Sequence, residues 1–563
     1  MENKLLDNAI ILSSSFQIDK DDKLAIAWKG NVFVDKTEAS FESLSHSFLT
    51  RDSLSSFYAK LSGFFALIVA DVESGSTYVF SDHMGSMPLF YTQQNGQTWL
   101  SDSLKPFKVT PSLTLTVSKQ AIYNYFYFHC IPAPGTIYAE CFKISPGHCI
   151  TVSKQGGIED VLLFNPHFAS QVTDSAAHKD CLTHIDDGVK RELTENVGAF
   201  LSGGLDSSTV AGMLAKHAKP AKTFSIGFKA EAYDETEYAQ ITAKHFSTEH
   251  RTFYLEPEDA AKKFVEVAQY FDEPFGNSSA MAAYFCAIFA KENGVTKLLA
   301  GDGGDELFAG NERYAKQKVF EHYYKIPSAL RTPLKSALSL PGVSSLSVVK
   351  KGQSYVRQAE IPLPQRLETY NFINQFGAEN MFTHEFLNNV DDSLPEAMQV
   401  ERYEQCNGEH IVDKMLFLDW KFTLADNDLV KVSKMCELAG IDVAYPMLEK
   451  ELVEFSCSVP ADTKLPGTEL RDFYKKACEG FLADETLNKS KHGFGLPFGV
   501  WLKENAALKD IATTALEKFK ARGIVKDSLI EQALEAHNNV HAGYYGELIW
   551  IMVILELWLS EHA

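Results

Sequence analysis

Short hydrophobic runs alternate with turn-forming residues over the first third of the chain. Four runs have the length and composition of strands, namely residues 23–34, 64–70, 76–80 and 98–101. The glycine-containing pairs near them are typical of tight turns. The pattern predicts a mainly antiparallel, β-rich domain over residues 1–165, and a polar stretch near residues 166–176 marks its end.

After residue 176 the hydrophobic runs are paired with helical segments. Residues 197–201 precede a helical segment at 207–217, and residues 223–228 precede another at 235–246. Strands that alternate with helices predict a doubly wound parallel sheet. We therefore expect a second, α/β domain over residues 176–563 whose part beyond residue 310 is mostly helical.

Composition and charge exclude some classes of partner. The 563 residues carry a formal net charge of −21, and an acidic chain repels phosphate backbones, so we expect no nucleic acid. Nine scattered cysteines without metal-site spacing predict reduced, buried thiols. The polar N-terminal segment does not resemble a secretory signal, and the apolar run 548–559 is short for a membrane span and contains Glu556. We expect a buried helix there, no membrane partner and a cytoplasmic location.

The strongest motif is the segment Ser-Gly-Gly-Leu-Asp-Ser-Ser at residues 202–208, between a predicted strand and a predicted helix. Open α/β sheets bind ligands at the carboxyl ends of their strands. Glycines let the backbone approach a phosphate, the helix N-terminus offers free N–H groups, and Asp206 is a ligand type that Mg²⁺ prefers. The segment is similar to the pyrophosphate-binding loop of enzymes that split ATP into AMP and pyrophosphate. The alternative is a glycine-rich turn that only caps a helix.

Two further clusters carry charge. Asp302, Asp305 and Glu306 lie within five residues after the hydrophobic run 297–299. Such a cluster favours a bound cation, and Mg²⁺ with pyrophosphate would supply one; a solvated acidic turn is the alternative. Lys491 lies in a loop rich in Gly and Pro, where a held lysine can stabilise a developing oxyanion. An exposed surface loop is the alternative there.

These three clusters, in this order and spacing, resemble the synthetase domain of the asparagine synthetases. Residues 223–228 are similar to the family's strand over the adenine, and residues 272–275 resemble its exopolysaccharide and carbohydrate-cluster branch. The resemblance covers residues 176–563 and implies an ATP-pyrophosphatase-type α/β fold. It also implies that the protein uses ATP and Mg²⁺ to activate a carboxylate as an acyl-adenylate.

The resemblance assigns roles to individual residues. Asp206 and Asp305 would hold Mg²⁺, and Lys491 and Asp302 would be catalytic. ATP and pyrophosphate would be bound by Leu201, Ser202, Gly203, Gly204, Asp206, Ser207, Ser225, Ile226, Ala300 and Gly301.

The front part is similar to the family's glutaminase domain, which has the N-terminal-nucleophile fold of two stacked antiparallel sheets with flanking helices. The family's nucleophilic cysteine follows the initiator methionine, but Glu2 stands there and the first cysteine is Cys130. Lys29-Gly30 replaces the family's Asn-Gly oxyanion pair, and Glu42 is the nearest candidate for its glutamine-binding carboxylate. Because this hydrolysis requires a thiolate, we expect a degenerate glutaminase.

Departures in the second domain affect positions that line the acceptor side in the family. Val432-Ser433-Lys434 replaces Val-Asp-Arg, residues 443–449 lack the usual arginine and end in Glu449, and Asn311 stands where tyrosine is frequent. The loops assigned to ATP are intact, so we expect an altered substrate rather than lost adenylation.

Three functions follow from this reading. The first is a ligase that joins a small-molecule carboxylate to an amine or ammonia without hydrolysing glutamine itself, including ring closure as in β-lactam synthetases and lasso-peptide cyclases. The second is an asparagine synthetase or sugar-acid amidotransferase that receives nitrogen from a partner. The third is a catalytically inactive regulatory paralogue. A homodimer is compatible with each, and ATP–pyrophosphate exchange discriminates the active forms from the inactive one.

Overall fold

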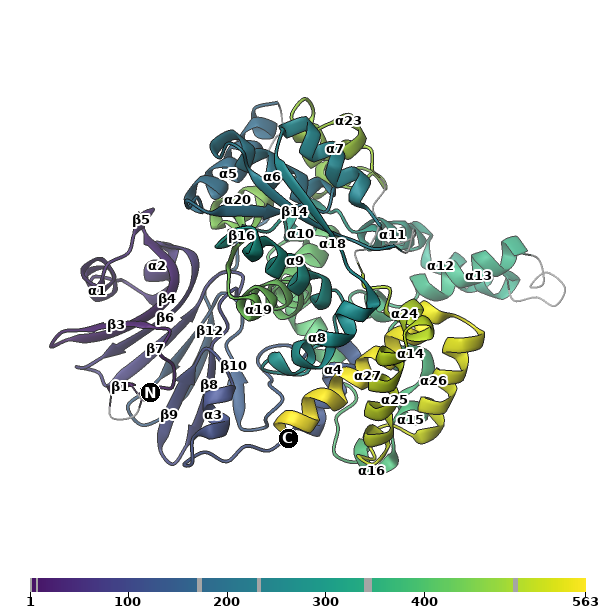
Figure 1. The fold of residues 1–563 in the computed structure, drawn as a ribbon, viewed down its shortest axis with the longest axis horizontal. Coiled ribbons are helices and arrows are strands. Elements are labelled where there is room, and N and C mark those ends of the chain that lie inside the picture. The colour runs from purple at the N-terminus through teal and green to yellow at the C-terminus, as the bar shows by residue number, and fades with distance from the viewer. Residues whose placement is uncertain (1–2, 7–8, 170–174, 230–233, 339–346, 490–494) are drawn as a thin grey trace.

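The computed structural model describes residues 3–6, 9–169, 175–229, 234–338, 347–489 and 495–563. Figure 1 shows a β-rich N-terminal part beside a larger part in which helices surround another sheet. We call these parts the front domain and the second domain. The division into residues 1–165 and 176–563 stays a prediction.

Two stacked β-sheets form the front domain. Their strand orders are β1-β2-β9-β8-β10 and β12-β11-β7-β6-β4-β3, with β5 paired to β4, and all pairs are antiparallel except β2 with β9. Ile11, Ile68 and Leu100 belong to the hydrophobic layer between the sheets. Helices α1 and α2 cover one sheet through Phe48 and Phe57, whose ring centroids are 5.3 Å apart. The fold expected for this part is therefore confirmed.

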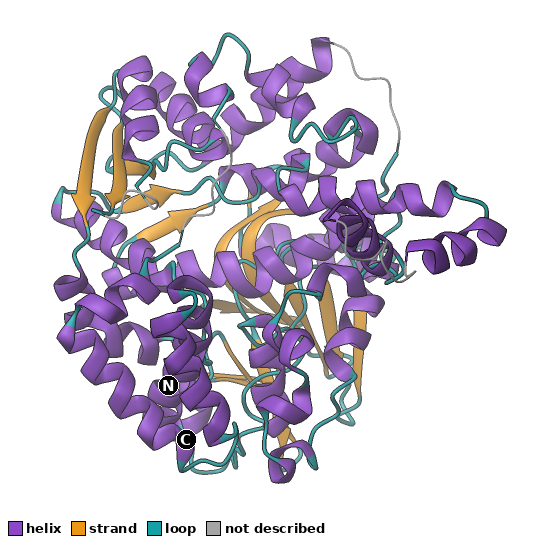
Figure 2. Cartoon of the chain, turned by 90° about the vertical axis from the view of Figure 1, so that its right-hand side faces the viewer, coloured by secondary structure: helices purple, strands orange, loops and turns teal. Residues whose placement is uncertain are grey.

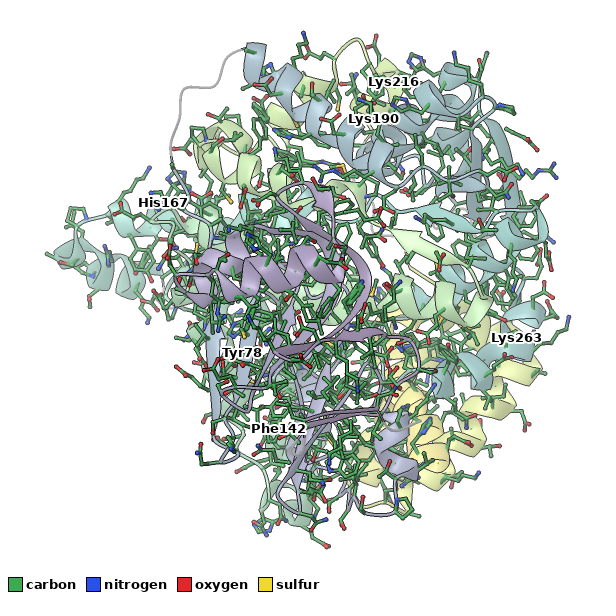
Figure 3. The ribbon with its side chains drawn as sticks, turned by 90° about the vertical axis from the view of Figure 1, so that its left-hand side faces the viewer. Tyr78, Phe142, His167, Lys190, Lys216 and Lys263 are labelled. Atoms are coloured by element: carbon green, nitrogen blue, oxygen red, sulfur yellow. The ribbon has the colours of Figure 1, made fainter. Side chains whose placement is uncertain are left out.

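The elements of the front domain have these bounds: β1 (Asn3–Leu6), β2 (Ala9–Ile11), β3 (Gln17–Lys20), β4 (Leu24–Val34), β5 (Thr37–Glu38), α1 (Phe41–Leu49), α2 (Leu54–Ala59), β6 (Leu61–Asp71), β7 (Ser76–Ser81), β8 (Phe90–Gln94), β9 (Gln97–Ser101), α3 (Lys105–Val109), α4 (Lys119–Phe128), β10 (Cys141–Lys143), β11 (His148–Val152) and β12 (Ile158–Leu162). In Figure 3, Tyr78 on β7 and Phe142 on β10 mark this domain, and Lys190 and Lys216 mark the second domain above it.

A five-stranded parallel sheet forms the centre of the second domain, in the order β15-β14-β13-β16-β17. The chain runs from β13 outward to β15 and then returns to place β16 on the other side of β13. The strand order therefore reverses at β13, and ligands of open α/β sheets bind at such a switch point. The helices α6 and α7 pack together against one face, while α9 and α19 pack together against the other (Figure 1). This confirms the predicted doubly wound sheet.

The sheet and its nearest helices have these bounds: α5 (Ser175–Arg191), β13 (Val197–Phe200), α6 (Leu205–His217), β14 (Lys222–Gly227), α7 (Thr236–Phe246), β15 (Glu249–Tyr254), α8 (Pro257–Tyr270), α9 (Ala280–Glu292), β16 (Lys297–Leu299), α10 (Gly304–Phe308), α19 (Leu429–Ala439) and β17 (Asp442–Ala444).

The rest of the second domain is helical, and helices make up most of the face seen in Figure 2. The bounds are α11 (Glu312–Glu321), η2 (His322–Lys325), α12 (Ser328–Leu338), α13 (Ser347–Ala359), η3 (Gln365–Glu368), α14 (Phe372–Phe376), α15 (Ala378–Met381), α16 (His384–Leu387), α17 (Leu394–Glu404), α18 (Ile411–Asp419), the π-helix η4 (Trp420–Asp428), η5 (Pro446–Leu448), α20 (Lys450–Ser458), α21 (Ala461–Lys464), α22 (Asp472–Cys478), α23 (Asp484–Leu487), α24 (Phe498–Glu504), α25 (Ala506–Lys520), α26 (Asp527–Asn539) and α27 (Ala542–His562).

Helix α27 is apolar and largely buried. By length and composition alone it could cross a membrane, but 67% of its most apolar 18-residue stretch is buried inside the protein. It packs against α8, α24, α25 and α26, and its Glu556 carboxylate accepts hydrogen bonds from the Arg522 guanidinium. The predicted buried helix is therefore confirmed as part of the core.

Buried polar contacts join the two domains. Lys143 of β10 forms an ion pair with Glu273 at 2.8 Å. Lys450 of α20 donates hydrogen bonds to the carbonyls of Ala59 and Leu61, both at 3.0 Å. These contacts satisfy buried polar groups of both domains across the boundary.

Candidate functional site

The first candidate loop lies between β13 and α6, at the switch point of the parallel sheet. Helix α6 has Gly204 as its N-cap, and no side chain caps the N–H groups of its first turn. Those donors and the positive end of the helix dipole favour an anion. Gly203 has φ +74°, and a Cβ there would lie 2.4 Å from the Ala239 nitrogen, so this turn requires glycine.

The second candidate loop follows β16 and touches the first. A Cβ on Gly301 would lie 2.6 Å from the Ser207 nitrogen, and one on Gly304 would lie 2.1 Å from Asp206 Oδ1. The neighbouring strand β14 contributes Ser225, whose hydroxyl donates a hydrogen bond to the Leu201 carbonyl. Glycines in the second loop thus let the two loops meet at backbone distance.

A cavity of about 350 Å³ opens where these loops meet, and we call it the nucleotide cavity. Its lining includes ten of the residues predicted to bind ATP, pyrophosphate or Mg²⁺ or to act in catalysis. They are Leu201, Ser202, Gly204, Asp206, Ser207, Ser225, Ile226, Gly301, Asp302 and Asp305. Gly203 and Ala300 lie in the same two loops, next to lining residues. Lys491 falls outside the described residues, so its role stays a prediction.

Arg471 connects the two carboxylates that were predicted to hold Mg²⁺. Its Nη1 atom lies 3.2 Å from Asp206 Oδ2 and 3.1 Å from Asp305 Oδ1. It occupies the N-cap position of α22 with φ +57°. The two carboxylates therefore converge on one positive group, as they would on a divalent cation. Among the described residues no three His, Cys, Asp or Glu side chains form a complete metal site. This donor set fits Mg²⁺, which takes one or two carboxylates and completes its shell with phosphate oxygens and water.

Asp302 lies beside an ion pair between Asp428, the last residue of the π-helix η4, and Lys431 of α19. Desolvation raises the pKa of Asp302 to about 6; Lys431 opposes this rise and Asp428 adds to it. Lys431 Nζ itself lies 2.7 Å from Asp428 Oδ1. Both residues line the nucleotide cavity. The cavity thus holds a carboxyl group that changes charge near neutral pH.

The loop that carries Lys491 is anchored at its described end. Lys489 pairs with Glu235 at 3.0 Å, and its ammonium lies 4.9 Å from the centre of the Tyr238 ring. The Lys489 side chain is only 7% exposed. The loop therefore begins inside the nucleotide cavity, which Lys489 lines, rather than in solvent.

Sequence reasoning missed Arg471, Lys431 and Asp428. Arg471 belongs to none of the three motifs, and it meets Asp206 only because α22 folds back onto the sheet. A positive charge far along the chain has no local signal that relates it to an acidic loop. The pair of Asp428 and Lys431 follows the ordinary i,i+3 spacing of a helix surface.

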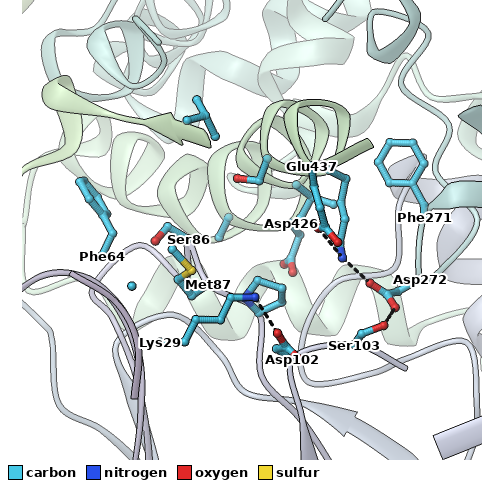
Figure 4. A pocket seen from close by; sticks show the side chains of 18 of the residues that line it. Lys29, Phe64, Ser86, Met87, Asp102, Ser103, Phe271, Asp272, Asp426 and Glu437 are labelled. Carbon is cyan, nitrogen blue, oxygen red and sulfur yellow. Dashed lines mark hydrogen bonds and ion pairs between the residues drawn. The ribbon is translucent and has the colours of Figure 1, made fainter. Parts of the chain in front are cut away.

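A larger cavity of about 520 Å³ lies between the two domains (Figure 4). Lys29 points into it and forms an ion pair with Asp102 at 2.6 Å. Lys434 pairs with Asp272 at 2.9 Å, and both line the same cavity. Glu42 lies exposed in the first turn of α1 and is not among the lining residues. The resemblance matches position 29 to the asparagine of the oxyanion pair, and the structure has at this position a lysine paired with Asp102.

The positions expected on the acceptor side lie at several places in the structure. Ser433 and Lys434 line the interdomain cavity, and Ser433 exchanges a hydrogen bond with the Tyr445 hydroxyl at 2.7 Å. Glu449 is buried and pairs with Arg191 at 2.7 Å. Asn311 caps helix α11 by accepting a hydrogen bond from the Arg313 N–H. Each of these side chains has a partner at its own position, and the expected change of substrate stays a prediction.

All nine cysteines are buried and unpaired by disulfides, which confirms the expected buried thiols. Burial raises the pKa of every one of these thiols above its usual value. A thiol held in its neutral form is a poor nucleophile.

Sequence comparison finds relatives for both domains. The family described as Asparagine synthase matches residues 182–560, and the family described as Glutamine amidotransferase domain matches residues 35–161. The glutamine-hydrolyzing asparagine synthetase 1 of Bacillus subtilis is 26% identical over 506 residues, which cover 89% of this chain and 78% of that protein. A putative glutamine-hydrolyzing asparagine synthetase 2 of Methanocaldococcus jannaschii is 30% identical over 312 residues, 52% of this chain and 58% of that protein. The amidase chyE of Penicillium rubens is 22% identical and covers 85% of this chain and 76% of its own.

The first match spans well over half of the chain and includes both loops of the nucleotide cavity. The second falls on the stacked sheets of the front domain. This chain is therefore a member of the asparagine synthase family, with a front domain of the glutamine amidotransferase type.

Proposed function

We propose that the protein is an ATP-dependent, AMP-forming carbon–nitrogen ligase. It activates a small-molecule carboxylate as an acyl-adenylate with release of pyrophosphate, and an amine or ammonia then attacks the acyl carbon. The observation that carries the proposal is the meeting of two glycine-rich loops at the switch point of the parallel sheet, where Asp206 and Asp305 share Arg471.

The geometry of the loops supports the placement of ATP. The uncapped N–H groups of α6 would bind phosphate oxygens, and Ile226 would lie against the nucleoside. Asp206 and Asp305 would hold Mg²⁺, which neutralises phosphate charge when it is bound. Arg471 would keep the two carboxylates in place when the cation leaves.

Two residues would act on the reacting atoms. Asp302, whose pKa desolvation raises to about 6, would be ionised at neutral pH and would orient the incoming amine or the metal ion. Lys491 would place a positive charge at the developing oxyanion, an effect typically worth about 10²–10³ in rate. The ion pair of Lys431 and Asp428 would fix the positions of the two charges that act on the Asp302 carboxyl group.

We also propose that this chain does not hydrolyse glutamine. All nine thiols are buried with raised pKa values, and Lys29 is paired with Asp102 in the cavity between the domains. The front domain would then serve as a structural partner of the second domain, which is supported by their buried ion pair of Lys143 and Glu273.

A second candidate is an asparagine synthetase that takes ammonia from solvent or from a partner protein. The name of the Bacillus subtilis relative favours it, because that protein is an asparagine synthetase. In both candidates the enzyme acts on small-molecule substrates in the cytoplasm and has no nucleic-acid or membrane partner. Both allow a homodimer.

Calorimetric titration with Mg²⁺–ATP tests the assignment of the nucleotide cavity. The parent protein should bind, and Asp206→Ala should weaken binding because it removes a metal ligand. Asp186→Ala is a matched control, since Asp186 lies on α5 in surface ion pairs with Lys190 and His217. Equal affinity of Asp206→Ala and the parent would refute the loop assignment.

A further inference from the structure

A third cavity, of about 420 Å³, lies among α4, η3, α14, α17, α18, η4 and α27, and we call it the acidic cavity. Figure 1 shows α4, α14 and α27 close together in the helical part of the second domain. The π-helix η4 contributes Phe422, Thr423 and Asn427 to this cavity and Leu424 to the nucleotide cavity. π-helical segments occur frequently at functional sites.

The charge of the lining is unbalanced. It contains one arginine, Arg313, and three carboxyl groups, those of Glu368, Asp419 and Glu547. Arg313 forms its ion pair with Asp419, which also accepts a hydrogen bond from the Tyr314 hydroxyl. Across the described parts of the chain, neither Glu368 nor Glu547 has a lysine or arginine within 4.0 Å. Within the described structure, two carboxyl groups therefore line the cavity without an ion pair to lysine or arginine.

The nearest imidazole does not neutralise this charge. His129 Nδ1 lies 3.7 Å from Glu547 Oε1, but burial lowers the pKa of His129 to about 4, so the ring is neutral at pH 7. Glu547 lines the cavity with a half-buried side chain, and desolvation raises its carboxyl pKa to about 7. Desolvation is also the largest cause of the raised pKa of Glu368, which Arg313 and the amides of Gln399 and Asn371 oppose. A cation bound here would stabilise both carboxylates.

Aromatic rings form the walls beside Glu547. The Phe372 and Tyr544 ring centroids lie 5.0 Å apart, and the His129 ring stacks on Phe372 at 5.9 Å. Phe128 stacks on Phe422 at 5.0 Å on the wall formed by α4 and η4. Ring faces attract organic ammonium groups and also bury an apolar body, whereas a bare metal ion would leave these walls unused.

We propose that the acidic cavity is a binding site, separate from the nucleotide cavity, for a small organic molecule with a primary ammonium group on an apolar body. The ammonium group meets the carboxylates of Glu547 and Glu368, and the body lies against Phe372 and Tyr544. The site does not depend on the proposed ligase activity, because none of these residues lines the nucleotide cavity.

This site is tested by measuring the binding of phenethylamine to the full chain, by ligand-observed NMR titration in the absence of ATP. The neutral isostere 2-phenylethanol and the anion 3-phenylpropionate are the matched probes. Phenethylamine should bind about tenfold more tightly than 2-phenylethanol, as expected for charge pairing and ring contact. Saturating Mg²⁺–ATP should not displace it.

Glu547→Gln keeps the shape of the side chain and should abolish the preference for phenethylamine while 2-phenylethanol binds as before. Glu561→Gln, an exposed glutamate on the same helix, should leave the preference intact. Equal binding of phenethylamine and 2-phenylethanol by the parent, displacement by ATP, or a preference that survives in Glu547→Gln would each overturn the proposal. Loss of ligase activity would leave this result unchanged, so the two proposals fail separately.

Discussion

Replacing Arg471 with methionine removes the positive group that lies between Asp206 and Asp305. The guanidinium is 3.2 Å from one carboxylate and 3.1 Å from the other. In the variant the two carboxylates repel each other across the site, without the shared cation that stabilised both. We therefore expect lower stability, and a stability that depends on Mg²⁺.

The exposure of the three side chains sets the size of the expected loss of stability. Arg471 is 10% exposed, and Asp206 and Asp305 are 16% and 19% exposed. Breaking a fully buried pair costs about 3–5 kcal/mol, and exposed pairs contribute about 0–1 kcal/mol. Because this cluster is little exposed, its contribution should be close to that of a buried pair, and we expect the free energy of unfolding to fall by about 3 kcal/mol. For a domain of this size that corresponds to a fall in Tm of roughly 5 °C.

Thermal unfolding with and without Mg²⁺ measures both effects. Arg471→Met should unfold at lower temperature than the parent, and millimolar Mg²⁺ should restore most of the difference, because a divalent cation can take the place of the guanidinium. Arg471→Lys keeps the charge and should lose less. The parent, whose two carboxylates already share the guanidinium, should respond less to Mg²⁺. A variant that is destabilised but indifferent to Mg²⁺ would refute the convergence of Asp206 and Asp305 on a cation site.

Three further predictions concern catalysis. Lys491→Met should keep ATP binding while turnover falls by about 10²–10³, the usual effect of losing one oxyanion donor; near-normal turnover would place this lysine at the surface. Desolvation raises the pKa of Asp302 to about 6, so its carboxylate becomes protonated as the pH falls through 6, and the reaction rate should fall with it. Asp302→Asn should remove this acidic limb of the pH–rate profile. An unchanged profile in that variant would exclude Asp302 as the titrating group. The pure chain should release no glutamate from glutamine, and release that a substitution in this chain abolishes would show that the front domain is an active glutaminase.

Much of the nucleotide cavity could be predicted from the sequence because its signals are local. A hydrophobic strand, a glycine-rich turn and a helix follow one another within about twenty residues around Asp206, and this order also fixes the position of the turn in the sheet. The acidic loop at Asp302 follows a strand in the same way. The carboxyl ends of parallel strands lie at one edge of the sheet, so loops that follow neighbouring strands can meet, as these two do.

The remaining residues could not be predicted because their partners are distant in sequence. Arg471 reaches Asp206 across 265 positions, and only the packing of α22 brings them together. The π-helix η4 places neighbouring residues in different cavities, and its sequence has no signal that separates it from an α-helix. The structure places Ser433 and Lys434 on the cavity between the domains, a location that the motif did not reveal, and their assignment to the acceptor side stays a prediction. Such positions depend on how helices pack, which a motif does not encode.

ATP–pyrophosphate exchange is the measurement that tests the central claim most directly. Purified protein is incubated with Mg²⁺, ATP, labelled pyrophosphate and one candidate carboxylate at a time, with Asp206→Ala as the inactive control and Asp186→Ala as the surface control. We predict that one class of carboxylate supports exchange in the parent and in Asp186→Ala, and that Asp206→Ala abolishes it. Carboxylate-dependent cleavage of ATP to ADP and phosphate, without exchange of pyrophosphate, would contradict the account.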